Sequence, residues 1–332
     1  MSRIKRITAA ALCALTALMG GCSGADVQPR EPLVIDYSPA AEPGKVTPPF
    51  WAVEDENTGA QVFLLGSMHA GTADASYPEY VLEAYRSSTY VAPELDTIAL
   101  SGNNALLSKC AGYLRLSTGT AADYIRNHDE TVEYFKQLGI YDPALESMVP
   151  FYWSSVFSSS VLGAAGLDSS CGTESQFLQM AHSGHKEIRE IEGAESQYKM
   201  MGGVPMSVQS ELVAECTGDE NFRKQVDSTK ELFEAWRSFD EDYFQGLEVY
   251  DPESAEDPDN WQTYYNMMYA DRQKNMARFI ENALQNGERA FVFVGTMHFY
   301  AEPSIITLLG EAGYTVRAIR PDSAEISETP AA

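Results

Sequence analysis

Two stretches, VFLLGSMH at residues 62–69 and FVFVGTMH at residues 291–298, indicate the architecture of this chain. Each is an apolar run of strand length, followed by glycine, a small hydroxyl residue, methionine and histidine. A short apolar run that stops at a glycine is typical of a buried strand. The similarity of the two stretches predicts a mixed α/β fold of two pseudo-repeated strand–GxxH halves, with a large helical insert between them.

The remaining pattern places strands near both ends and helices in the middle. Strands are expected over residues 61–65, 89–93, 186–191, 290–294 and 314–319. Short helices are expected over 80–86 and 305–311, and one long helix over 261–286. Most of 105–198, with a clear helix at 131–138, and parts of 211–247 are also expected to be helical. The stretch 251–259 is acidic and contains two prolines, which favours a loop.

The candidate chemistry lies just past the predicted strands. His69 and His298 follow the carboxyl ends of two strands, where α/β sheets place their ligands, and Gly66 and Gly295 allow the chain to turn there. Glu94 also follows a strand. Two imidazoles and one carboxylate form a ligand set that leaves positions open for water and substrate. The alternative for each histidine is a hydrogen-bonded residue of the core.

The other histidines and the cysteines carry weaker signals. His182 and His185 lie three residues apart in a polar context that favours a solvated helix end, and His128 is expected at the surface. The sequence contains no Cys-x-x-Cys, His-Glu-x-x-His, Gly-x-Ser-x-Gly or phosphate-loop motif. In an exported protein two of three cysteines could pair, and these three are Cys110, Cys171 and Cys216.

Length and charge exclude several classes of protein. With 332 residues the chain forms one large domain or two small ones. Lys and Arg total 23 against 48 Asp and Glu, for a formal charge of −25. So acidic a chain argues against nucleic acid as the main partner and against electrostatic docking on anionic lipid.

The first residues resemble an export signal. Arg3, Lys5 and Arg6 precede an uncharged run over residues 7–19, and small residues then lead to Cys22. This pattern predicts a signal peptide over 1–21, a lipidated Cys22 and a proline-rich tether over 22–46. The folded domain is expected over 47–320, with a disordered tail over 321–332. The protein is thus expected to be exported and lipid-anchored at the extracytoplasmic face of the cell membrane. The alternative is a plain secreted protein.

Several blocks occur in an order that resembles the TraB/GumN family, relatives of the Tiki proteases. The blocks are VFLLGSMHAG with a later Tyr-Pro (62–78), YVAPELD (90–96), a middle block from QFL (176–178) to IEGAESQ (191–197), DRQKNMA (271–277), and the second histidine block through YTV (292–316). Together they cover most of residues 50–320, and the ordered set is specific although a single Gly-x-x-His is not.

The resemblance implies a metal-dependent hydrolase fold, with peptidase activity in animal members. Carried over by position, His69, His298 and Glu94 are the metal or catalytic residues. Arg272 and Asn275 would orient the substrate or the ligands. Glu192 and Asp96 are further candidates.

The chain departs from the family pattern in three places. Gly172-Thr173-Glu174 replaces a Gly-Ile/Val-Asp sequence, so the carboxylate moves by one methylene. Ala301-Glu302-Pro303 follows His298 where the family has glycine around an acidic residue. Arg272 and Asn275 are separated by two residues, whereas many members have them adjacent.

The combined hypothesis is a peptidase-like, metal-dependent hydrolase of peptides or small molecules. His69, His298 and Glu94 would hold one divalent ion of manganese, cobalt, zinc or iron, which makes hydroxide available at neutral pH. Glu94, Glu174 or Glu192 would act as general base, and Arg272 would stabilise the oxyanion. The alternatives are a non-catalytic surface lipoprotein that binds haem, a metal or another ligand, and a degenerate member that only contacts envelope proteins.

Overall fold

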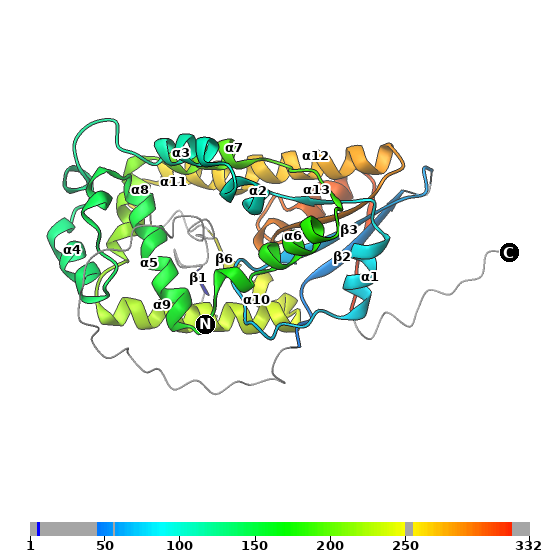
Figure 1. Cartoon of the computed structure of the whole chain (residues 1–332), viewed down its shortest axis with the longest axis horizontal. Coiled ribbons are helices and arrows are strands. Elements are labelled where there is room, and N and C mark those ends of the chain that lie inside the picture. Colours follow the sequence, from blue (N-terminus) through cyan, green and yellow to red (C-terminus); the bar gives the residue numbers. More distant parts are fainter. Residues whose placement is uncertain (1–4, 7–44, 56, 250–254, 321–332) are drawn as a thin grey trace.

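The computed structural model describes residues 5–6, 45–55, 57–249 and 255–320 (Figure 1). The predicted lipidation site Cys22 and the predicted tail lie outside these residues, as does the predicted signal peptide apart from Lys5–Arg6. The molecule is elongated, with a β-sheet at one end and a helical part at the other.

The sheet has six strands in the order β5-β4-β7-β3-β2-β8. Their bounds are Glu187–Ile188 for β5, Tyr90–Pro93 for β4, Arg289–Gly295 for β7, Ala60–Ser67 for β3, Phe50–Asp55 for β2 and Thr315–Ala318 for β8. The four strands β5, β4, β7 and β3 run parallel, whereas β2 is antiparallel to both β3 and β8. The prediction of a mixed α/β fold is therefore confirmed. Strand β2 was not predicted, because Pro48 and Pro49 directly precede it just after the expected tether, and prolines favour a loop.

Successive side chains of the central strands point to opposite faces of the sheet. On one face, Val62 and Leu64 pack in a cluster with Val292 and with residues of helices α12 (Asp271–Gln285) and α13 (Ile305–Glu311). On the other face, Phe63 and Phe291 pack with α1 (Glu79–Ser87) and α6 (Thr173–Ser183). Both faces are covered, which explains why β3 and β7 are apolar throughout instead of alternating.

The helical part lies between β4 and β7 in the chain and has two apolar clusters. Its helices are α2 (Thr97–Ser101), α3 (Asn104–Tyr113), α4 (His128–Gln137), α5 (Pro150–Ala164), α7 (Ala194–Gly202), α8 (Met206–Ala214), α9 (Asp219–Ser238), α10 (Glu241–Gln245) and α11 (Pro258–Tyr265). Short 3-10 helices occur at Ala121–Asp123, Pro143–Ser147 and Ser169–Cys171. A separate parallel pair joins β1 (Lys5–Arg6) to β6 (Leu247–Glu248).

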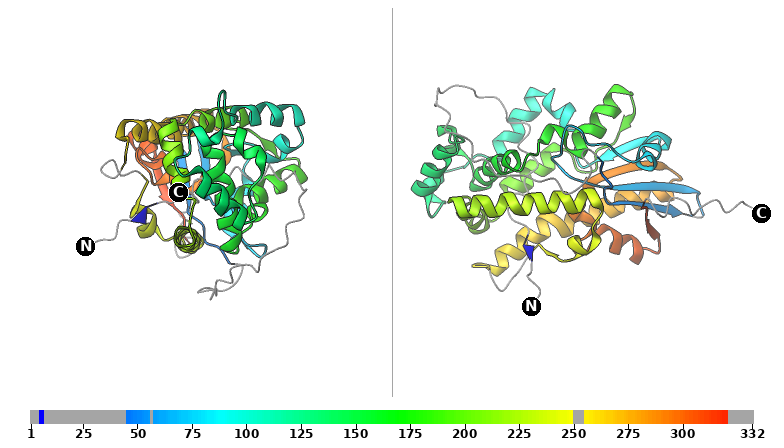
Figure 2. Two further views of the ribbon diagram at one scale, coloured as in Figure 1. Left: turned by 90° about the vertical axis from the view of Figure 1, so that its left-hand side faces the viewer. Right: turned by 90° about the horizontal axis from the view of Figure 1, so that it is seen from below.

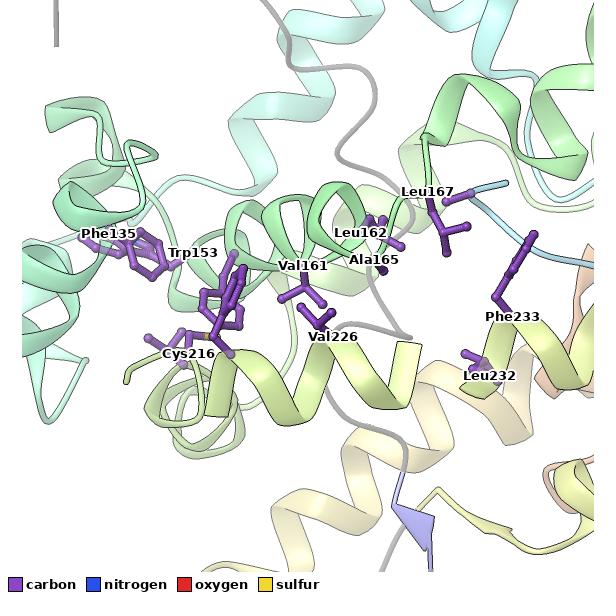
Figure 3. Close-up of a cluster of buried hydrophobic side chains, with 14 of the residues drawn as sticks. Phe135, Trp153, Val161, Leu162, Ala165, Leu167, Cys216, Val226, Leu232 and Phe233 are labelled. Carbon is purple, nitrogen blue, oxygen red and sulfur yellow. The ribbon is translucent and has the colours of Figure 1, made fainter. Parts of the chain in front are cut away.

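One of these clusters extends from the helical part to Ala70 and Met297, in the segments that follow β3 and β7. It includes Phe135 of α4, Trp153 and Val161 of α5, and Leu232 of α9 (Figure 3). Seen from below, α9 extends from the helical end of the molecule to the sheet (Figure 2). The carboxyl end of α9 therefore lies where the strands end.

The long helix predicted over 261–286 is interrupted. Helix α11 passes into a π-helical segment, Asn266–Ala270, before α12 begins at Asp271. The apolar spacing predicted helix throughout and gave no sign of the change in winding. Single π turns are frequently found at functional sites.

The structure does not confirm an internal repeat. The register pairs Gly66 with Val294 and Ser67 with Gly295, so the two Gly-x-x-His stretches are offset by one residue. After β3 the chain continues as a loop, whereas β7 is followed by a 3-10 helix, Thr296–Phe299. The similar stretches therefore follow different paths after their strands.

The cysteines that could have paired do not do so. Cys110 and Cys171 are free thiols, and the thiol of Cys216 donates to the carbonyl of Leu212. No disulfide therefore joins any two of these three residues. Among the helices of the described chain, none combines the length and the apolar character needed to cross a membrane.

Phe291 tests the importance of the second sheet face. Its ring is fully buried and lies within 5.1 Å to 6.2 Å of the ring centroids of Phe50, Tyr85, Phe177 and Phe293. We expect Phe291→Ala to lower the free energy of unfolding by about 3–5 kcal/mol in urea denaturation. The exposed Ile98 serves as control, since Ile98→Ala is expected to change it by no more than about 0.5 kcal/mol. Equal effects of the two changes would contradict this assignment of the core.

Candidate functional site

The two motif histidines meet at one edge of the sheet. Strands β3 and β7 are adjacent and parallel, and they end opposite each other at Ser67 and Gly295. His69 follows two residues after the first strand, and His298 three residues after the second, on the 3-10 helix. The carboxyl edge of parallel strands is where α/β folds bind their ligands.

His69, His298 and Glu94 converge on the backbone of Gly295. A β-carbon built on this glycine would lie 3.5 Å from Glu94 Oε1, 3.6 Å from His69 Nε2 and 3.6 Å from His298 Cδ2. The glycine therefore leaves a space about the size of a methyl group between the three side chains. The residues predicted as metal ligands are thus brought together around one point.

His69 is held by the carboxylate of Glu174. The distance from His69 Nδ1 to Glu174 Oε1 is 2.7 Å, and Ser67 Oγ donates to the same oxygen. Removal of water from the imidazole lowers its pKa, but the charge of Glu174 and the hydrogen bond to it outweigh this effect, and the pKa of His69 is raised. With Nδ1 occupied, Nε2 is the nitrogen that His69 presents to Gly295.

The start of α6 is hydrogen-bonded to the loop after β3 that carries Met68 and His69. The amide of Thr173 donates to Met68 O at 2.9 Å, and the amide of Met68 donates to Thr173 Oγ1 at 3.1 Å. A β-carbon on Gly172 would lie 2.3 Å from His69 O, so a glycine is required for this approach. The packing places Glu174, in the first turn of α6, beside His69. The Gly-Thr-Glu sequence that departs from the family pattern therefore supplies the partner of this histidine.

Glu94 is held by a largely buried ion-pair network. Its Oε1 accepts from the amide of Gly295 at 2.8 Å, and its Oε2 accepts from Arg272 Nη2 at 2.6 Å. Arg272 also donates through Nε and Nη2 to the two oxygens of Glu192, each at 2.8 Å. Gln197 Nε2 donates to both glutamates. Burial raises the pKa of Glu94, but Arg272, the two histidines and the Gly295 amide outweigh it and lower the pKa to about 2.

The π-helical segment contributes to the position of Arg272. Arg272 Nη1 donates to Met268 O, inside that segment, at 3.2 Å. The guanidinium is thereby bound to its own helix as well as to both glutamates. Its side chain is only 13% exposed, and it is neutralised by partners on the segments that follow β4 and β5.

His298 differs from His69 in its surroundings. Its side chain is 6% exposed, Nε2 lies 3.8 Å from Glu94 Oε1, and Nδ1 has no partner within the described residues. Burial lowers its pKa, and the nearby Arg272 adds to this effect, so the pKa falls to about 3. His298 is therefore neutral near pH 7. Gln273 Nε2 donates to the carbonyls of His298 at 3.4 Å and Ala301 at 2.9 Å, which fixes the backbone of the histidine turn.

Two further predicted residues lie away from this network. Asn275 is on an exposed part of α12 and accepts from Arg278 at 3.3 Å. Asp96 caps the start of α2 and lies 2.8 Å from His182 Nε2. Gly66 has a packing role, since a β-carbon there would lie 2.9 Å from Thr296 Oγ1.

Sequence reasoning gave no role to Ser67, Gln197 or Gln273. Ser67 and Gln197 belong to the motif blocks, but a hydroxyl or an amide forms no pattern that predicts its partner. Gln273 is buried within an otherwise polar helical turn, DRQK, and that contrast appears only in the structure. These three side chains position the histidines and glutamates.

These groups line a pocket of about 80 Å³. The polar lining comes from Ser67, His69, Glu94, Arg272 and His298. The apolar lining includes Met68, Leu232, Trp236, Phe244, Met268 and Met297. The pocket therefore combines two imidazoles, a carboxylate and a guanidinium with an apolar wall.

The donor set partly suits a metal ion. Within the described residues, no group of three or more His, Cys, Asp or Glu side chains forms a ready-made metal site. The space beside Gly295 nevertheless faces an imidazole nitrogen of His69, a carboxylate oxygen of Glu94 and the ring of His298. Glu174, Glu94 and Glu192 carry three negative charges against one on Arg272. A cation bound by His69 would displace the proton that Glu174 favours on this imidazole, because a metal ligand must be neutral. With both histidines neutral in that state, a divalent cation would balance the excess of two negative charges.

The ion-pair network can be tested by measuring how the contribution of Glu94 to stability changes with pH. Because its folded pKa of about 2 lies below the usual 4.5, ionised Glu94 contributes stability that is present above pH 4.5 and is lost as the pH falls through 2. We expect Glu94→Gln to lose roughly 3 kcal/mol of unfolding free energy at pH 7. The difference from the unchanged protein should shrink between pH 4.5 and pH 2 in urea denaturation.

The exposed Glu79, paired with Arg86 on α1, is the matched control. Glu79→Gln is expected to change stability by less than about 1 kcal/mol at any of these pH values. A Glu94→Gln difference that stays constant from pH 7 to pH 2 would contradict the role given to the Glu94 charge.

Comparison with known proteins places this site in a family. No match was found among curated proteins or among solved structures. A family model described as the TraB/PrgY/gumN family matches residues 49–318, which span the sheet, the helical part and every residue of the site. The chain therefore belongs to the TraB/PrgY/gumN family.

Proposed function

We propose that the protein is a metal-dependent hydrolase of the peptidase type. The observation that carries the proposal is the convergence of His69, His298 and Glu94 on the space beside Gly295. The membership of the TraB/PrgY/gumN family supports it. An ion in this space would supply a Lewis acid and make hydroxide available at neutral pH.

Three residues would hold the ion. His69 offers Nε2, since Nδ1 is bound to Glu174, and such a carboxylate–histidine pair is typical of metal-bound imidazoles. The low pKa of His298 keeps this side chain neutral, as a ligand must be. Glu94 Oε1 accepts one hydrogen bond from Gly295 and retains a second lone pair.

The remaining polar residues bind and orient. Arg272 lines the pocket, where its positive charge can stabilise an oxyanion that develops on the substrate. Glu192 binds Arg272 and does not line the pocket, so it acts through the guanidinium. Glu174 acts through His69 in the same way. Of the three predicted general bases, Glu94 is the one that faces the pocket.

The site favours this proposal over haem binding. A pocket of about 80 Å³ accommodates water and a single side chain of a substrate, whereas cofactor-sized ligands occupy about 300–1,000 Å³. Titration with haemin tests the alternative, because a Soret band that disappears in His69→Ala would favour a haem-binding protein.

Export and lipid anchoring belong to the same proposal and rest on the signal-like residues 1–21 and on Cys22. Mass spectrometry of the intact membrane-extracted protein tests them. We expect cleavage before Cys22 and a lipid mass on that residue, and Cys22→Ser should abolish both. A Cys22→Ser protein that is processed and retained at the membrane like the original would contradict the anchor.

Metal content tests the ligand assignment. The purified chain without a His tag is expected to bind about one equivalent of manganese, cobalt, zinc or iron, measured by inductively coupled plasma mass spectrometry. His69→Ala and His298→Ala should each lose the metal while remaining folded by circular dichroism. Asn275→Ala, on the exposed part of α12, is the control and should keep it. Full metal in either histidine variant would overturn the assignment.

Gly295 allows a test that leaves every ligand in place. The β-carbon of Gly295→Ala meets the three side chains at 3.5–3.6 Å, which is ordinary van der Waals contact, so the variant should fold. The methyl group fills the space proposed for the ion, and we expect loss of metal and at least about a 100-fold loss of peptide hydrolysis.

Gly310→Ala is the matched control, because no atom beyond its chain neighbours and its own helix backbone lies within 4 Å of its β-carbon position on α13. Hydrolysis is measured by mass spectrometry on a mixed peptide library. A folded Gly295→Ala protein with unchanged metal and unchanged hydrolysis would show that the chemistry lies elsewhere.

A further inference from the structure

The pocket has an apolar wall that metal binding and hydrolysis do not require. Together with the charged groups, the apolar side chains of Met68, Leu232, Trp236, Phe244, Met268 and Met297 line the pocket. These residues come from distant parts of the chain: the two histidine motifs, α9, α10 and the π-helical segment. The fold therefore brings five separate segments together to form this apolar wall.

Trp236 has the largest ring on this wall, and its only polar atom is hydrogen-bonded within the protein. Trp236 Nε1 donates to the carbonyl of Gly66 at 2.8 Å, so the indole contributes its apolar surface to the pocket. Phe244 stacks on Tyr300 with ring centroids 5.0 Å apart, and Trp236 stacks on Phe233 at 5.8 Å. Packing with these neighbours fixes both rings, so this part of the wall is rigid.

The methionines form the adaptable part of the wall. Met68 and Met297 each directly precede a motif histidine, and both are only partly buried. Unbranched thioether side chains rearrange around apolar groups of different shape. In each motif the methionine therefore offers a bound substrate an apolar contact next to the polar contact offered by the histidine.

We propose that this wall is a specificity subsite for an apolar substrate side chain of the size of leucine, methionine or phenylalanine. The proposal rests on the hydrolase function and names its substrate class: peptides with such a residue next to the bond that is cleaved. A polar side chain would leave its hydrogen-bonding groups unpaired against the wall, which disfavours it. Leu232, which lies on α9 at the end of its cluster away from Phe135 (Figure 3), lines the subsite.

The subsite is tested without relying on catalysis. The full chain is labelled with 13C in its methionine methyl groups, and N-acetyl amides of leucine, methionine, phenylalanine, serine and aspartate are titrated. We expect the methyl signals of Met68, Met268 and Met297 to shift with the three apolar amides. The apolar amides should bind at least about tenfold more tightly than the serine and aspartate amides.

Variants at Leu232 give the matched comparison. Leu232→Trp fills the subsite and should abolish the shifts, while Leu232→Ala enlarges it and should move the preference towards phenylalanine. Unchanged signals of Met148 and Met276, which belong to other apolar clusters, report that each variant is folded. Equal shifts with serine and leucine amides, or shifts that persist in a folded Leu232→Trp protein, would overturn the subsite.

Cleavage of a peptide library separates the two proposals. If the unchanged protein cleaves no peptide but shows the apolar preference by NMR, the hydrolase function fails and the subsite stands. If peptides are cleaved without an apolar residue next to the bond, and Leu232→Trp leaves that pattern unchanged, the subsite fails and the hydrolase function stands.

Discussion

The parallel pairing of β3 with β7 is the constraint on which the site depends. Their register ends both strands at the same edge, with Ser67 opposite Gly295, and so brings His69 and His298 together. Both faces of these strands are buried, which fixes the register, since a shift of one residue would turn every side chain to the other face. The geometry of the site is therefore maintained by the packing of the core.

The charged groups around the two motif histidines then shift their pKa values in opposite directions. His69 faces Glu174, which raises its pKa, whereas His298 is more deeply buried near Arg272, which lowers its pKa to about 3. Arg272 is itself buried between two carboxylates, and a buried charge requires such partners. Gln197 completes the network by donating to both of those carboxylates. One imidazole is thus held by an anion and the other is kept neutral beside a cation.

Much of this arrangement could be predicted from the chain. The apolar runs predicted β3, β4, β7 and β8, and the resemblance indicated His69, Glu94, Glu174, Glu192 and Arg272, which the structure places in one connected site. Strand β2 was missed because Pro48 and Pro49 directly precede it, and prolines favour a loop. The π-helical turn was missed because its apolar spacing matches that of an α-helix. Asn275 lies one turn after Arg272 but is exposed, which depends on how α12 packs.

By itself the sequence determined most of the strands and helices and the residue types that can carry chemistry, because apolar spacing and glycine act locally along the chain. Only the tertiary structure decided which groups meet: Glu174 with His69, Glu192 with Arg272, and a wall of methionine, leucine and aromatic side chains beside them. These contacts join residues about 80 to more than 100 positions apart. Hydrogen bonds and ion pairs over such separations depend on how the helices pack against the sheet, and no local pattern records that packing.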